Sequence, residues 1–126
     1  MKCRRILLVE DHPDTAHVLV RVLRRNGYEV TCAGSVSAGL SALRSAEFDL
    51  LLCDIGLPDG TGLDLIRQAR EQLGLQIPAI ALTGFGMDDD VAKSKVAGFN
   101  EHLTKPVNLS LLENTIQRTL EPSTPA

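Results

Sequence analysis

Residues 50–65 read LLLCDIGLPDGTGLDL, an apolar run that ends at Asp54 and leads into a stretch with helical spacing. Two further runs of strand length, ILLV (6–9) and AIAL (79–82), also end at a polar residue and precede helical periodicity. This alternation is typical of βαβ units and predicts a parallel sheet. The less apolar segments YEVTCA (28–33) and FNEHLT (99–104) predict two further strands, at the sheet edges.

These five strands and the helices between them predict an α/β architecture, a doubly wound (βα)5 fold around one parallel sheet. Because the three most apolar strands belong at the centre, we expect the strand order 2-1-3-4-5 with right-handed crossovers. A helix over roughly residues 88–97 is the least amphipathic. The other helices have apolar stripes at Ala16, Leu19, Val22 and Leu23; at Val36, Leu40 and Leu43; at Leu65, Ile66 and Ala69; and at Leu109, Leu112, Ile116 and Leu120.

Length and charge limit what the chain can be. Its 126 residues predict one domain, which we place at residues 1–120, followed by a flexible tail at 121–126. The net charge of −3, with acids and bases interspersed, offers no basic stripe for direct nucleic-acid binding. Three cysteines without CxxC spacing favour a reducing cytoplasm over a disulfide or zinc framework. The apolar run at 6–9 is too short to span a membrane, so we expect no membrane contact by this domain.

Polar side chains end the predicted strands: Glu10 and Asp11, Asp54, Thr83 and Lys105. Each taken alone has an ordinary role as a cap, a turn former or a solvated lysine. Strands in this topology bring all five to one edge of the sheet, where ligands bind at the switch point. Three carboxylates there repel one another unless a cation intervenes, and an oxygen-only set favours Mg²⁺. Asp54 is then the central carboxylate placed to accept a phosphoryl group whose charge the metal and Lys105 neutralise.

Four segments resemble the successive signatures of response-regulator receiver domains of two-component signalling, and together they span nearly the whole chain. The resemblance implies a flavodoxin-like fold and a phosphoacceptor switch that is not an enzyme beyond its own phosphorylation and dephosphorylation. It also implies a cis bond between Lys105 and Pro106. The segments are LLVED (7–11), LLLCDIGLPDGTGLDL (50–65), ALTGFG (81–86) and HLTKP (102–106).

The resemblance also assigns roles within the phosphorelay. It implies that Asp54 is the phosphoacceptor, that Asp11 binds Mg²⁺ directly, that Glu10 acts through water, and that the Gly56 carbonyl is a further ligand. Thr83 and Lys105 would bind the phosphoryl oxygens. A histidine next to this acid pair, His12, suits Mg²⁺ poorly, so we expect it at the rim of the site.

The implied phosphoryl donor is a histidine kinase or a histidine phosphotransfer protein. Two segments, DIGLPDGTGLDL (54–65) and AGFNEHLTKPV (97–107), are especially similar in sequence to receivers attached to hybrid sensor histidine kinases. Val18 lies beside the apolar stripe of the first helix, so we expect it to face outward. With Thr15 and Pro106 it would form the docking surface for the donor.

A switch is expected to run from Thr83 to the fourth helix, the fifth strand and the last helix. His102 occupies a position that is commonly aromatic in such receivers, and it is either the switch residue or a half-exposed residue of an edge strand. The same face could also pair two copies in a weak homodimer.

Three alternatives compete with this interpretation. A haloacid-dehalogenase-like phosphohydrolase needs a second aspartate two residues after the first, where Gly56 stands. A flavodoxin-like cofactor binder needs a Gly/Ser/Thr-rich loop after the first strand, where the chain reads DHPDT (11–15). A docking module that works without phosphorylation is disfavoured by the complete acceptor set but is not excluded by it.

Overall fold

The structure is a computed structural model that describes residues 4–84 and 97–120. Its main sheet contains five parallel strands hydrogen-bonded in the order β2-β1-β3-β6-β7. Numbered along the chain, these strands are the predicted 2-1-3-4-5, so the topology is confirmed. The strands are β1 (Arg5–Val9), β2 (Glu29–Ala33), β3 (Leu50–Asp54), β6 (Ala79–Thr83) and β7 (Glu101–Thr104).

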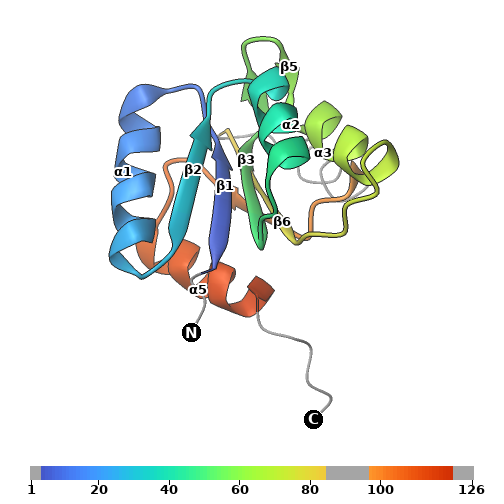
Figure 1. Cartoon of the computed structure of the whole chain (residues 1–126). Helices are drawn as coiled ribbons and strands as arrows, with labels where there is room; N and C mark the ends of the chain where they lie inside the picture. The colour runs from blue at the N-terminus through green and yellow to red at the C-terminus, as the bar shows by residue number, and fades with distance from the viewer. Residues whose placement is uncertain (1–3, 85–96, 121–126) are drawn as a thin grey trace.

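Helices cover both faces of the sheet (Figure 1). α1 (Pro13–Arg25) and α5 (Leu109–Leu120) lie on one face, and α2 (Val36–Ser45) and α3 (Gly62–Glu71) lie on the other. Leu8 and Leu52 join the α1 and α5 core, whereas Leu7 and Leu51 join the α2 and α3 core. Because both faces are buried, the central strands read as continuous apolar runs. No described helix has the length and apolarity needed to cross a bilayer.

Most predicted core positions are buried, with three departures, one of which is Leu120, the last residue of α5, which is only partly buried. Leu109 is 40% exposed, because it is the first residue of α5 and lines a surface groove beside Pro106. Val22 is only partly buried on α1. The predicted helix at 88–97 lies mostly outside the described residues, as does the tail at 121–126. The confirmed positions are Ala16, Leu19, Leu23, Val36, Leu40, Leu43, Leu65, Ile66, Ala69, Leu112 and Ile116.

A short hairpin, which the sequence analysis did not predict, follows β3. β4 (Gly56–Leu57) and β5 (Gly60–Thr61) pair antiparallel, and α3 starts directly after them. Thr61 caps α3 by accepting a 3.1 Å hydrogen bond from the Asp64 amide. The hairpin therefore joins the end of the central strand to the start of a core helix.

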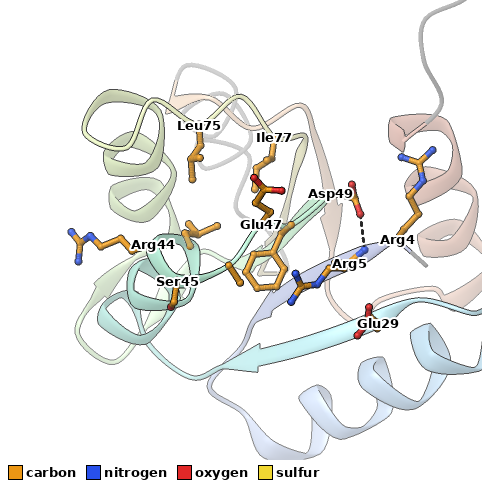
Figure 2. Close-up of a pocket in the computed structure, with 12 residues that line it drawn as sticks. Arg4, Arg5, Glu29, Arg44, Ser45, Glu47, Asp49, Leu75 and Ile77 are labelled. Atoms are coloured by element: carbon orange, nitrogen blue, oxygen red, sulfur yellow. Dashed lines mark hydrogen bonds between the residues drawn. The ribbon is translucent and has the colours of Figure 1, made fainter. Parts of the chain in front are cut away.

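A cavity of about 920 Å³ opens at the amino ends of the strands, away from the predicted site (Figure 2). The Arg5 guanidinium there lies 5.4 Å from the centroid of the Phe48 ring. The Arg5 amide donates to Asp49 Oδ2 at 2.8 Å. None of the predicted site residues lines this cavity.

Candidate functional site

The five predicted site residues lie at the carboxyl edge of the sheet. Glu10 and Asp11 follow β1, Asp54 ends β3, Thr83 ends β6 and Lys105 follows β7. The Glu10 amide donates to Ala33, and the Lys105 amide donates to the Thr83 carbonyl at 2.8 Å, so the strand ladders fix their backbones. The structure thus brings these five residues to one edge of the sheet, as predicted.

Lys105 bridges two buried carboxylates. Its Nζ atom lies 2.6 Å from Glu10 Oε1 and 2.8 Å from Asp54 Oδ2. The side chains of Glu10 and Asp54 are 0% and 8% exposed, so both charges are largely removed from water. Burying such charges is unfavourable unless a partner compensates them, and the ammonium supplies that compensation for both.

The two carboxyls differ in their affinity for protons. Burial raises the pKa of Asp54, the neighbouring Glu10 raises it further, and Lys105 opposes the shift without cancelling it. Burial would also raise the pKa of Glu10, but Asp54, Lys105 and the His12 amide favour its ionised form and lower it. The pKa of Lys105 is raised, because its two carboxylate partners outweigh the effect of burial. The environment of Asp54 therefore disfavours its ionised form, unlike that of Glu10.

Asp11 supplies an oxygen that lacks a partner. Its Oδ1 atom is buried and has no hydrogen-bond partner among the described residues. His12 Nδ1 lies 3.3 Å from this atom and 3.3 Å from Glu10 Oε2, and the imidazole is 66% exposed. His12 is therefore at the rim, as expected. Although His12 Nδ1 is near, it makes no hydrogen bond to Asp11 Oδ1, and a buried carboxylate oxygen without a hydrogen bond favours binding of a cation.

The donor atoms of this cluster fit a small, hard cation. One ligand atom from each of Glu10, Asp11, His12 and Asp54 can be chosen so that all lie within 4.8 Å of one another. Mg²⁺ takes one or two carboxylates and keeps several waters, which suits a carboxylate cluster that is open on one side. The unpartnered oxygen of Asp11 and the excess of negative charge agree with such an ion.

Gly56, at the start of the hairpin, touches the Asp54 carboxylate. Its amide donates to Asp54 Oδ1 at 3.3 Å, while the Gly62 amide closes the hairpin base by donating to the Ile55 carbonyl at 2.7 Å. Sequence reasoning named Gly56 but missed the hairpin that holds it. The signal was present in Pro58, Asp59 and Gly60, a combination typical of tight turns.

The hydroxyl of Thr83 is turned toward the neighbouring strand. Thr83 is 1% exposed, and its Oγ1 donates to the Leu103 carbonyl at a long 3.4 Å. His102 pairs with Ala81 in the ladder and is partly exposed on β7. Most of the segment between these strands, where the switch was predicted, is residues 85–96 and lies outside the described residues.

The predicted docking residues line one groove next to the site. Thr15, Val18 and Pro106 share a cavity of about 570 Å³ with Lys105. Val18 is 49% exposed, as its place beside the α1 stripe predicted. The bond between Lys105 and Pro106 is cis, also as predicted. Because Lys105 also contacts Glu10 and Asp54, the groove adjoins the carboxylate cluster through this residue.

Comparison with known proteins decides the family. The model of the response regulator receiver domain matches residues 6–117. This chain belongs to that family. It is a receiver domain of two-component systems, a family whose general role is to accept a phosphoryl group. Membership decides against the phosphohydrolase and flavodoxin-like alternatives.

Curated relatives of this receiver domain include proteins of very different length. An uncharacterised 14.6 kDa protein of Leptolyngbya boryana is 38% identical over 90% of this chain and 87% of its own. The response regulator protein PilR of Pseudomonas aeruginosa is 35% identical over 95% of this chain but only 27% of PilR. The sensor histidine kinase RcsC of Escherichia coli is 31% identical over 88% of this chain and 12% of RcsC. Receivers of hybrid kinases are thus among its relatives.

Solved receiver structures share the fold closely. A response regulator receiver domain protein of Methanospirillum hungatei has a TM-score of 0.88 at 32% identity, covering 94% of both chains. The receiver domain of sensor histidine kinase PA1611 of Pseudomonas aeruginosa has a TM-score of 0.85 at 32% identity, covering 94% of this chain and 98% of that one. The latter was solved with a magnesium ion coordinated in its active-site cleft.

Proposed function

We propose that Asp54 accepts a phosphoryl group from a phosphohistidine of a histidine kinase or histidine phosphotransfer protein. One observation carries the proposal: the buried Asp54 carboxylate is held by Lys105 beside the unpartnered oxygen of Asp11. An Asp54 oxygen attacks phosphorus, forming a P–O bond as the P–N bond breaks. The electron pair of the broken bond stays on the imidazole nitrogen, which leaves an acyl phosphate and a free histidine.

The surrounding residues have separate tasks. Asp11, Asp54 and the Gly56 carbonyl would hold Mg²⁺ directly, and Glu10 would act through water. When bound, the ion supplies positive charge that the phosphoryl oxygens need. The Lys105 ammonium can redirect its hydrogen bond from Asp54 to the phosphoryl oxygens. Its 2.6 Å bond to Glu10 meanwhile keeps the ammonium at the site.

We propose that the donor docks on the groove formed by Thr15, Val18 and Pro106. Half-exposed Val18 gives a donor helix an apolar contact, and Lys105 at the groove edge places that contact next to Asp54. A modest, transient interface suits a partner that must leave after transfer.

The output is proposed to begin at Thr83. Its long bond to Leu103 is weak, so the hydroxyl can exchange that carbonyl for a phosphoryl oxygen at little cost. Partly exposed His102, on the adjacent strand, would respond to the space that Thr83 leaves. Thr83→Ala should abolish distant NMR shift changes on adding beryllofluoride, and His102→Ala should reduce them.

The wider setting follows from the same proposal. We infer a cytoplasmic switch domain over residues 1–120 that turns over only its own phosphoryl group and binds no nucleic acid directly. Weak self-association through the face that includes β7 and α5 is compatible with the switch. Its partners would contact the domain at the groove formed by Thr15, Val18 and Pro106 and at the face that includes β7 and α5.

Labelling with acetyl phosphate tests the acceptor assignment. Wild-type protein with MgCl₂ should gain the mass of one phosphoryl group, and it should gain none in EDTA. Asp54→Asn should remain unlabelled while keeping its fold by circular dichroism. A wild type that takes no label would instead favour the docking module that works without phosphorylation.

A further inference from the structure

We propose that Asp59, at the tip of the β4–β5 hairpin, is a positioning residue for the acceptor and metal site. It ties the hairpin to α2 and thereby holds Gly56 against Asp54. The inference rests on the proposed function of Asp54, but it concerns a residue that lies outside the acceptor cluster and is exposed.

The tip of the hairpin is bound to the start of a helix 22 and 23 residues earlier in the sequence. Asp59 Oδ1 accepts from the Val36 amide at 2.8 Å, and Oδ2 accepts from the Ser37 amide at 3.0 Å. Ser35 Oγ accepts from the Ala38 amide at 3.0 Å. The first three amides of α2 are thus shared between the helix's own cap and a carboxylate from another segment.

Those two bonds are favourable for the ionised carboxylate. They lower the pKa of Asp59, and the positive end of the helix dipole acts in the same direction. A Cβ atom added to Gly60 would lie 3.3 Å from Val36 Cγ2, so the tip also contacts α2 closely. The hairpin tip is therefore hydrogen-bonded to α2 and lies close to its first residue.

The helix that receives the tip is itself fixed in the core. Leu40 and Leu43 of α2 are buried, and a Cβ on Gly39 would lie 2.7 Å from Leu65 Cδ1 of α3. Such close packing leaves α2 little freedom to shift relative to the sheet. Asp59 is therefore tied to a rigid element rather than to another loop.

The base of the hairpin is equally constrained. Leu57 pairs with Gly60, and Gly56 pairs with Thr61. An added Cβ on Gly62 would lie 2.3 Å from the Asp54 carbonyl oxygen, so the two ends of the hairpin are in tight contact. With base and tip both fixed, the backbone of Gly56 has one position relative to the Asp54 carboxylate. Releasing the tip frees the hairpin to pivot about its base.

The experiment compares Asp59→Ala and Asp59→Asn with two matched controls. Ser35→Ala removes another cap of the same helix without touching the hairpin. Asp64→Asn removes one exposed charge next to Gly60 without cutting the tether. For each variant we would measure the Mg²⁺ dissociation constant by amide NMR titration, the labelling rate with acetyl phosphate, and the melting temperature.

Asp59→Ala should weaken Mg²⁺ binding about tenfold, the effect typical of losing a residue that orients metal ligands, and should slow labelling. Asp59→Asn, which keeps one acceptor oxygen, should lie between Ala and wild type. Both controls should bind Mg²⁺ like wild type, even where Ser35→Ala melts as early as Asp59→Ala.

Two results overturn the inference while leaving Asp54 as the acceptor. In one, Asp59→Ala and Ser35→Ala have the same Mg²⁺ affinity, which reduces Asp59 to a helix cap. In the other, Asp64→Asn weakens Mg²⁺ binding as much as Asp59→Ala, which assigns the effect to charge. A wild type that neither binds Mg²⁺ nor takes label overturns the proposed function, and this inference with it.

Discussion

Lys105 donates to Glu10 Oε1 at 2.6 Å, a shorter contact than its 2.8 Å bond to Asp54 Oδ2. Glu10 is inaccessible to solvent, so it serves as a fixed partner that keeps the ammonium at the site. The lysine expected to bind phosphoryl oxygens is therefore also needed by the fold, because it compensates two buried carboxylates.

Replacing Lys105 by Met should destabilise the protein, because Glu10 and Asp54 would remain buried without their cation. We expect a loss of about 2 kcal/mol in urea unfolding, between the values for exposed and fully buried pairs. Added MgCl₂ should recover part of the loss. Arg118→Met, which breaks the exposed pair with Glu101, should cost less than about 0.5 kcal/mol. Equal losses for the two variants would contradict this account of Lys105.

Asp54→Asn should raise the melting temperature of the metal-free protein at pH 7. Burial raises the pKa of Asp54, so the fold favours its neutral form. The stabilising contribution of neutral Asp54 is therefore fully present below the pKa of about 4 that this carboxyl has in the unfolded chain. It is lost as the pH rises through the higher pKa of Asp54 in the folded protein. The increase in melting temperature caused by Asp54→Asn should become smaller as the pH falls toward 4. Adding Mg²⁺ at pH 7 should also make this increase smaller. A gain that is equal at both pH values would contradict the assignment.

Gly62→Ala should damage both fold and site. A Cβ at this position would lie 2.3 Å from the Asp54 carbonyl oxygen and 3.1 Å from Cys53 Sγ, so β3 and α3 must separate. Overpacking of this kind costs about 1–3 kcal/mol in unfolding experiments. Gly34→Ala is the matched control, since its Cβ would meet nothing within 4 Å. A Gly62→Ala protein as stable as Gly34→Ala would refute the tight contact.

Val18→Asp should slow phosphoryl transfer from a histidine phosphotransfer protein about tenfold or more, because a charge would replace an apolar contact. Labelling by acetyl phosphate should not change, since that donor needs no docking surface. Leu111→Asp supplies the control: Leu111 is 50% exposed on α5 but does not line the groove. Loss of transfer in both variants would show that the groove is not the specific docking surface.

The strand order and the gathering of five polar residues were predictable because both follow from backbone rules. Continuous apolar runs identify the central strands, and parallel strands bring their carboxyl ends to one edge. The buried stripes of α2 and α3 were equally readable from helical spacing. Leu109 was misjudged because periodicity alone does not show that it is the first residue of α5 and lines a surface groove.

The attachments between segments distant in sequence were not predictable in the same way. Asp59 reads as an ordinary turn residue, and only the fold shows that it meets Val36. The bond of the Thr83 hydroxyl to the Leu103 carbonyl depends on the register of β6 and β7. Such contacts depend on three-dimensional distances that no local pattern encodes.

The position of Asp54 on β3 also limits how the domain can respond to modification. All five residues of β3 are buried, and the strand is paired on one side with β1 and on the other with β6. Asp54 pairs with Leu82 of β6, and the preceding residue, Cys53, pairs with both neighbouring strands, so opening β3 would disrupt two ladders and requires nearly global unfolding. The amides of β3 should therefore be among the slowest to exchange with deuterium, before and after phosphorylation, and any change in exchange should fall on the segments around them.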